Sequence, residues 1–327
     1  MYDYGLSTLE QYGLEAKSTA RTRGALLCRT EQGLLILREY HGSGKKLAMQ
    51  QELLQKLEND GWKVDSFLTN GEGELISYDR DRIPYTLQRW YEGRECDTKC
   101  RDDIGSGLCT LAGLHKVMKL TPVEDYQEKS LEEEFLRHNQ ELRKIRKFIR
   151  RKNPSGAFEK EYLSSVDFFL NKGQEALEML KDSGYEKLRQ ESFCQGRVCH
   201  GEYNQHNVLI LKEGTAVTNF GHWGFDLQMA DLYRFMRKIL EKYGWDISLA
   251  RTMLRTYHRE RTITPEEWRN LAVRFTYPEK YWKLANYYYS HNKAWISEKN
   301  IEKLKVLIRQ KEQWESFTEK CFSSYPF

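Results

Sequence analysis

Residues 198–231 read VCHGEYNQHNVLILKEGTAVTNFGHWGFDLQMAD, and polar side chains in this stretch lie on both sides of two short apolar runs. The runs are residues 208–211 and 216–217, and the four residues between them include Gly214. A glycine between two such runs is typical of a β-hairpin turn. We therefore predict a hairpin at the centre of this stretch, with one polar loop before it and another after it.

The two polar loops have a characteristic spacing. The tripeptide HGE begins at His200, Asn207 follows five residues after Glu202, and the tripeptide NFG begins at Asn219. This layout resembles the loops of the protein-kinase-like fold used by aminoglycoside and choline phosphotransferases, which read H-G-D, four residues, N, hairpin, then D-F-G or D-x-D. The resemblance implies catalytic positions for His200 and Glu202. It also implies that Asn207 and Asn219 stand at the metal-ligand positions.

Two of these positions carry altered side chains. Phosphoryl transfer uses an Asp to position the attacking hydroxyl, and an Asn and a second Asp to hold magnesium. Glu202 keeps the first carboxylate but extends it by about 1.5 Å, and a shift of about 1 Å can cost roughly 100-fold in rate. Asn219 removes a negative charge from a site that favours carboxylate oxygens. Asp226 is the alternative ligand, provided that its loop folds back.

The N-terminal region predicts a second hairpin. Residues 25–30 and 34–40 are apolar runs separated by a short polar segment with a glycine. In the kinase-like fold, the second of these strands carries a lysine that holds the nucleotide phosphates, and the aligned residue here is Arg38. Arginine keeps the charge but is longer and forked. The alternative interpretation is that Arg38 is a surface residue at the edge of a strand.

Residues 44–60 have the apolar spacing of a helix. In the resembling fold, an acid on this helix pairs with the phosphate-holding cation, and Glu52 is the candidate; the alternative is a solvated helix face. Arg38 and Glu52 would then be the nucleotide-binding residues. Gly24 stands alone before this region, so a tight glycine-rich phosphate loop is not predicted.

The rest of the chain predicts one more strand pair and then mainly helices. The expected strands are 75–78 and 84–93. Residues 88–90 would form a hinge whose backbone could accept an adenine edge, although nothing in the sequence requires it. A short helix leading into the first β region is expected within residues 1–20, and further helices are expected at 102–119, 124–152, 157–171 and 173–183, and throughout the C-terminal third. Another begins near Asp231, which the resemblance makes a support for the catalytic loop. The predicted fold is α+β and kinase-like, with a β-rich lobe (1–92) and a larger helical lobe (93–327).

Composition narrows the functional classes. The formal charge is +4, from 52 basic and 48 acidic residues, which argues against nucleic acid as the partner despite the basic segment 143–152. The chain has seven cysteines and no C-x-x-C motif, which favours a reducing compartment over a disulfide framework. Cys96 and Cys100 lack a nearby histidine at ligand spacing, so no metal site is predicted there. We expect no signal peptide and no membrane-spanning segment.

A set of ordered strings narrows the resemblance to one family. The strings LRKIRKFIRRKN, SGYEKL, CHGEYNQHNVLI, FDLQMADLYRFMRKILEKYGWD and YPEKYWKLANYYYSHNKAW resemble the CotS family of spore coat proteins, over about residues 4–317. The resemblance implies a two-lobed kinase-like fold and spore coat proteins as partners. It also implies a location in the mother-cell cytoplasm and the spore coat of an endospore-forming bacterium.

Family and fold leave the activity open, because function depends on the site. The leading hypothesis is a pseudokinase or scaffold whose Mg-ATP site is altered at Arg38, Glu202 and Asn219, and whose aromatic C-terminal lobe contacts coat proteins. The alternative is an active small-molecule phosphotransferase that uses ATP and magnesium. In that case Glu202 is the base and Asn207 is a metal ligand, together with Asn219 or Asp226.

Overall fold

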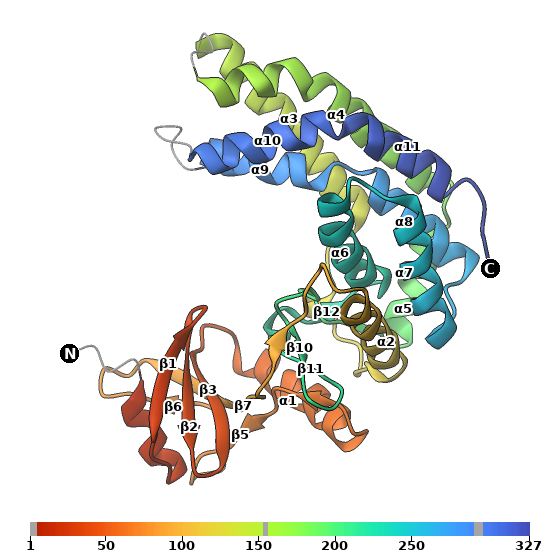
Figure 1. The fold of residues 1–327 in the computed structure, drawn as a ribbon. Coiled ribbons are helices and arrows are strands. Elements are labelled where there is room, and N and C mark those ends of the chain that lie inside the picture. The colour runs from red at the N-terminus through yellow and green to blue at the C-terminus, as the bar shows by residue number, and fades with distance from the viewer. Residues whose placement is uncertain (1–4, 153–155, 291–296) are drawn as a thin grey trace.

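The computed structural model describes residues 5–152, 156–290 and 297–327. The chain forms a crescent with two unequal lobes (Figure 1). A β-sheet from the N-terminal part of the chain lies at one end, and a stack of long helices lies at the other. This arrangement confirms the predicted α+β architecture, with a small β-rich lobe followed by a larger, mainly helical lobe.

The small lobe is built on a six-stranded antiparallel sheet. Its strands are β1 (Ser18–Thr22), β2 (Ala25–Thr30), β3 (Gly33–Glu39), β5 (Phe67–Leu68), β6 (Ser77–Tyr78) and β7 (Pro84–Arg89). The main path runs β1-β2-β3-β7-β5, and β6 pairs with β7. The predicted hairpin of β2 and β3 is confirmed, with Thr30 paired to Gly33 at its turn.

The two faces of this sheet carry different side chains, because residues alternate along each strand. Leu35 and Leu37 of β3 pack with Leu9 from a 3-10 helix, η1 (Leu6–Tyr12), in the core of the small lobe. Arg38 therefore points to the opposite face. The short helix predicted within residues 1–20 corresponds to η1, and β1 follows it as expected; residues 1–4 lie outside the described residues.

Helix α1 (Gly44–Asn59) matches its prediction closely. Its first turn is capped by Ser43, whose hydroxyl accepts from the backbone N–H of Lys46 at 3.2 Å. The apolar positions that predicted it, including Leu53 and Leu57, are fully buried in the main core. The helix therefore forms because one apolar stripe packs against the rest of the molecule.

The central hairpin is part of a second sheet that joins the lobes. Strands β10 (Val208–Ile210) and β11 (Thr215–Val217) form the predicted hairpin. Strand β4 (Lys63–Val64) pairs with β11 in parallel, and β8 (Arg94–Glu95) pairs with β10, giving the order β4-β11-β10-β8. Segments far apart in the sequence therefore meet at the two polar loops.

The large lobe contains ten helices within the described residues. They are α2 (Arg101–Val117), α3 (Leu131–Lys152), α4 (Ala157–Lys181), α5 (Tyr185–Cys194), α6 (Met229–Leu240), α7 (Ile247–Glu260), α8 (Pro265–Thr276), α9 (Glu279–Ser290), α10 (Glu298–Arg309) and α11 (Lys311–Cys321). A two-stranded sheet of β9 (Val198–Cys199) and β12 (Gly224–Phe225) lies beside the polar loops.

Two predicted helix boundaries in this lobe are wrong. Helix α3 begins only at Leu131, because Ser130 caps it through a hydrogen bond to the backbone N–H of Glu133. Helix α4 is continuous, whereas two helices were predicted with a break before Gly173. A Cβ at Gly173 would lie 2.4 Å from the Asn139 side-chain oxygen, so this glycine permits close approach of α3 and does not end a helix.

The C-terminal third has both buried and exposed aromatic side chains. Trp268, Phe275, Tyr277 and Tyr281 are buried, whereas Tyr287 and Tyr289 are exposed, so the expected aromatic contact with coat proteins stays a prediction. No helix in the described part of the chain is both long and apolar enough to cross a membrane.

Candidate active site

His200 links the two polar loops through both ring nitrogens. It follows β9 directly and is fully buried. Its Nε2 donates to the Thr218 carbonyl oxygen at 2.9 Å, and its Nδ1 accepts from the backbone N–H of Glu202 at 3.1 Å. Both bonds require the neutral ring with the proton on Nε2. Burial lowers the pKa of His200, which favours this neutral form.

Asp231 holds the backbone of the first polar loop through two hydrogen bonds. Its two carboxylate oxygens accept from the backbone N–H of His200 at 2.6 Å and of Gly201 at 3.0 Å. Gly201 has φ +82°, and a Cβ there would lie 1.8 Å from the His222 carbonyl oxygen, so the turn requires glycine. The structure thus places Asp231 at the support position that the sequence predicted for it.

His115 of α2 is fully buried and contacts Asp231. Its Nε2 lies 3.4 Å from Asp231 Oδ2, and its Nδ1 lies 2.6 Å from the Tyr257 hydroxyl. Burial acts to raise the pKa of Asp231, but the hydrogen bond to His115 and the neighbouring positive groups hold it below its ordinary value. His115 therefore helps to keep the loop support ionised, and the sequence carried no signal for this contact.

Glu202 combines a fixed backbone with an exposed side chain. Its carbonyl oxygen accepts from the side-chain amides of Asn204 at 2.7 Å and Asn207 at 2.9 Å. Its carboxylate is about half exposed, at 51%, and Nε2 of His222 lies 4.0 Å from it. The carboxylate is thus presented to solvent on a rigid loop.

Asn207 and Asn219 are brought together, as the kinase-like spacing predicted. The Asn219 side-chain N–H donates to Asn207 Oδ1 at 2.6 Å, and Asn207 is anchored in turn to the Glu202 carbonyl. Asn219 has a left-handed backbone with φ 70°, which Asn adopts more readily than most residues. The two predicted metal ligands are therefore bonded to each other.

The carboxylate nearest to these loops in the small lobe is Asp65, which the sequence analysis did not identify. Asp65 is fully buried between β4 and β5, and its Oδ2 accepts from the backbone N–H of Asn219 at 2.7 Å. Burial raises its pKa to about 6, against the opposing effect of the Arg38 charge. The only sequence signal for such a residue is an acid between the apolar residues Val64 and Phe67.

Arg38 points into the protein and not to the solvent at the edge of a strand. Its guanidinium stacks over the Trp90 ring at 5.3 Å, and its Nε is buried with no hydrogen-bond partner within the described residues. Burial lowers the pKa of Arg38, while the Asp65 charge raises it. The electrostatic partner of Arg38 is therefore Asp65.

The predicted pairing of Glu52 with Arg38 is wrong. Glu52 lies on the exposed face of α1 and pairs with Lys56 at 2.6 Å, one helical turn away. The alternative metal ligand Asp226 is also engaged elsewhere. Both of its oxygens lie within 3.4 Å of Arg274 Nη2, and it follows β12 on the side of the larger lobe. Neither acid supplies the carboxylate that the loops lack.

The predicted hinge uses its backbone donors inside the small lobe. The N–H of Arg89 donates to the Ser66 carbonyl at 2.8 Å, and the N–H of Trp90 donates to the Leu34 carbonyl at 2.9 Å. Gln88 also bonds inward, from its side chain to the Asp65 carbonyl at 2.6 Å. The N–H groups of Arg89 and Trp90 and the side chain of Gln88 therefore already bond within the small lobe and are not free to bond an adenine ring.

The donor set at the paired asparagines does not fit a kinase-type magnesium site. Magnesium is usually held by one or two carboxylates together with substrate phosphates. The Asn207 oxygen accepts from Asn219, and neither of the two residues offers a carboxylate. The two amides thus satisfy each other without a cation.

Both the sequence and the fold relate this chain to known proteins. Residues 7–321 match the family model described as "Spore coat putative kinase YutH". The chain belongs to this family. This match confirms the predicted relationship to kinase-like spore coat proteins.

A curated relative supports the coat relationship. Spore coat protein S of Bacillus subtilis (strain 168) is 25% identical over 174 residues, which are 53% of this chain and 50% of that protein. The match thus spans about half the length of the relative.

Solved structures establish the fold of this YutH-family chain. An aminoglycoside phosphotransferase from Alicyclobacillus acidocaldarius superposes with a TM-score of 0.85 at 17% identity, over 97% of this chain and 95% of that one. A microcompartment-associated aminopropanol kinase gives 0.64 at 12% identity, over 98% and 97%. Amicoumacin kinase, solved with AMP-PNP and calcium, gives 0.58 at 14% identity, over 94% and 89%. The predicted kinase-like fold is confirmed.

Proposed function

We propose that this spore coat kinase-like protein is a pseudokinase that acts as a scaffold in the coat or its assembly and does not transfer phosphate. Membership of the YutH family supports the coat context. The relative named spore coat protein S supports it as well. On this proposal the chain functions in the mother cell and the spore coat, and its partners are coat proteins.

The hydrogen bond between Asn219 and Asn207 carries the proposal. In a phosphotransferase both positions present oxygens to magnesium, and one of those oxygens belongs to a carboxylate. Here an N–H of Asn219 occupies the Asn207 oxygen at 2.6 Å. Binding magnesium would require breaking this bond without gaining a carboxylate ligand, so the metal-free arrangement is favoured.

The small lobe supports the same interpretation. The cation at the phosphate-holding position, Arg38, stacks on Trp90; burial lowers its pKa and the charge of Asp65 raises it. The carboxylate of Asp65 accepts from the backbone N–H of Asn219, which links the small lobe to the second polar loop. This link needs no nucleotide, which supports a scaffold role.

A complementation experiment tests this proposal. A sporulating strain that lacks its own copy would receive a fluorescent fusion of the wild-type protein, the Glu202→Ala variant or the Asn207→Ala variant. We expect all three to reach the spore coat equally. Measurable phosphotransfer by the purified wild-type protein that is lost in Glu202→Ala would overturn the proposal.

The second candidate is an active ATP-dependent small-molecule phosphotransferase. The observation that favours it is the intact catalytic loop, because His200, Gly201 and Asp231 keep their supporting hydrogen bonds and Glu202 presents a carboxylate to solvent. This candidate predicts magnesium-dependent ATP hydrolysis or transfer to a hydroxyl compound. Incubation with ATP labelled at the γ-phosphate and a panel of amino alcohols and sugars separates it from the scaffold.

A further inference from the structure

The larger lobe contains an open cavity of about 210 Å³ near the start of α6, which follows the catalytic loop. It is lined by residues of α3, α6, α8 and α9. The polar side chains that line it include Glu134, Arg137, His138, Arg234, Arg274 and Lys283. Positive groups thus outnumber acids among these six.

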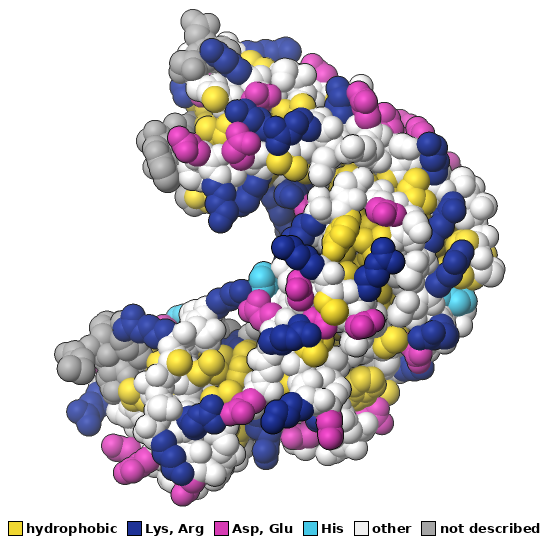
Figure 2. Space-filling view, viewed as in Figure 1, with side chains coloured by type: hydrophobic (Ala, Val, Ile, Leu, Met, Phe, Trp, Pro, Cys, Tyr) yellow, Lys and Arg dark blue, Asp and Glu magenta, His cyan; other side chains and the backbone are white. Residues whose placement is uncertain are grey.

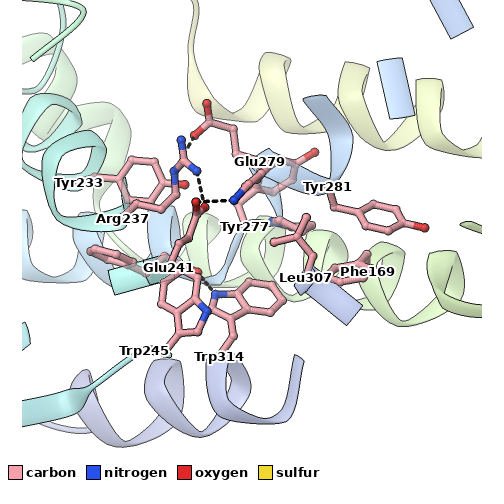
Figure 3. Close-up of a pocket in the computed structure, with 13 residues that line it drawn as sticks. Phe169, Tyr233, Arg237, Glu241, Trp245, Tyr277, Glu279, Tyr281, Leu307 and Trp314 are labelled. Carbon is pink, nitrogen blue, oxygen red and sulfur yellow. Dashed lines mark hydrogen bonds and ion pairs between the residues drawn. The ribbon is translucent and has the colours of Figure 1, made fainter. Parts of the chain in front are cut away.

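One acid of this cavity, Glu279, already has cationic partners. Glu279, which also lines the cavity, is held by Arg237 and Lys283. Figure 3 shows Arg237 between Glu279 and Glu241, on the side of the neighbouring smaller pocket that shares Tyr233 and Tyr277. Burial acts to raise the pKa of Glu279, but the charges of Arg237 and Lys283 lower it, so Glu279 stays ionised and committed to them.

Among the cations that line this cavity, Arg234 has the longest ion pair. The ion pair that it makes is a long one, 3.8 Å to Asp231, whose oxygens already accept from the loop backbone. Its guanidinium remains about one-third exposed, at 33%. One helical turn later, burial and the charges of Arg237 and Arg234 lower the pKa of Lys238, while Glu202 raises it. Positive charges therefore crowd the face of α6 that follows the catalytic loop.

The space-filling view agrees with this distribution. Lys and Arg side chains gather along the inner edge of the hollow on the side of the larger lobe (Figure 2). Like charges at short range repel each other, and the repulsion grows where the walls exclude water. An anion in the cavity would remove this repulsion.

An aromatic wall with an unused donor completes the cavity. His138 stacks on Trp282 with ring centroids 3.4 Å apart, and Arg137 donates to His138 Nε2 at 2.8 Å. Because Nε2 accepts, the ring proton of His138 lies on Nδ1, and Nδ1 is buried with no partner among the described residues. Burial lowers the pKa of His138 to about 3, so the ring is a neutral donor.

We propose that this cavity binds a small organic anion that carries a carboxylate or a phosphate group. The forked guanidinium group of Arg234 matches the oxygens of either group. Arg137 adds a positive charge that it shares with Glu141 at 3.2 Å, and the Trp282–His138 stack covers the organic part. A cationic amine would be repelled by the same charges. The inference goes beyond the proposed scaffold function and does not rest on it, because it requires neither ATP nor magnesium.

Isothermal titration calorimetry at low ionic strength tests the proposal. The probes are citrate and glucose 6-phosphate, which separate carboxylate from phosphate recognition, with glucose and spermidine as neutral and cationic controls. We expect one of the two anions to bind with 1:1 stoichiometry. Arg234→Gln should weaken this binding by roughly tenfold, because a charge-assisted hydrogen bond is lost. The matched control is Arg143→Gln, an exposed arginine of α3 outside the cavity, which should leave it unchanged.

A second variant keeps the test decisive if Arg234→Gln fails to fold. Glu134→Gln removes an acid from the lining without changing its shape, and it should tighten anion binding roughly threefold. The proposal is overturned if neither anion binds, if all variants bind alike, or if spermidine binds better than the anions. Magnesium-dependent ATP binding in the same instrument would contradict the proposed function and leave this inference standing.

Discussion

Asn219→Asp restores the carboxylate that kinase-like sites carry at this position. The variant keeps the backbone, because Asp tolerates the left-handed conformation of residue 219 about as well as Asn does. It removes the N–H that now donates to Asn207 Oδ1 at 2.6 Å and places an oxygen against that oxygen. We predict a less stable metal-free protein that responds to magnesium.

The size of the effect follows from the lost contact. Leaving a partly buried acceptor without its donor costs about 1–3 kcal/mol, and a new charge near the buried Asp65 adds to this loss. A shift of 1 kcal/mol changes the melting temperature by roughly 2 °C in a chain of this size. Magnesium at about 100 times its Kd would raise the free energy of unfolding of the variant by about 2.7 kcal/mol, since it binds only the folded state.

Differential scanning fluorimetry with and without magnesium measures both parts of this prediction. The wild-type protein should show no magnesium-dependent shift, and Asn219→Asp should melt roughly 2–6 °C lower without metal and recover with it. Asn59→Asp, at an exposed position of α1, is the matched control for the added charge. A wild-type protein that magnesium stabilises as strongly as the variant would refute the reasoning.

Three further predictions concern the loop supports. Gly201→Ala should lower the free energy of unfolding by at least about 2 kcal/mol in a urea titration, because its Cβ meets the His222 carbonyl; Gly214→Ala, with a similar φ of +78° and open space, should cost less. Asp231→Asn should cost about 1.5–3 kcal/mol in the same assay, since two backbone N–H groups lose a charged acceptor. Asp65 has a raised pKa of about 6, so the folded state holds its proton more tightly than the unfolded chain, and its contribution to stability increases as the pH falls from about 6 to about 4, by up to about 3 kcal/mol. Asp65→Asn should remove this part of the pH dependence, and an unchanged profile in urea titrations across that range would count against the buried-acid interpretation.

Local patterns in the sequence were sufficient for the elements around the site. The hairpin of β10 and β11 follows from two apolar runs and a glycine, and α1 follows from its apolar spacing and its polar start. The pairing of Asn207 with Asn219 followed from the kinase-like spacing of the two loops. These features depend on residues that are close in the sequence or on a recurring motif.

Contacts between distant segments could not be predicted in the same way. Asp65 accepts from the Asn219 backbone N–H only because β4 pairs with β11, which joins segments about 150 residues apart. The continuity of α4 through Gly173, where two helices had been predicted, depends on packing against Asn139 of another helix. Glu52 was assigned by analogy, and the structure places it one turn from Lys56 on an exposed face.

The most direct test of the proposed metal-free site is an isothermal titration of the wild-type protein with ATP, with and without magnesium, beside Asn207→Ala. If the paired asparagines close the metal position, magnesium adds no binding heat and the two proteins behave alike. Magnesium-dependent ATP binding at micromolar to millimolar Kd that disappears in Asn207→Ala would contradict the pseudokinase interpretation and establish a working nucleotide site.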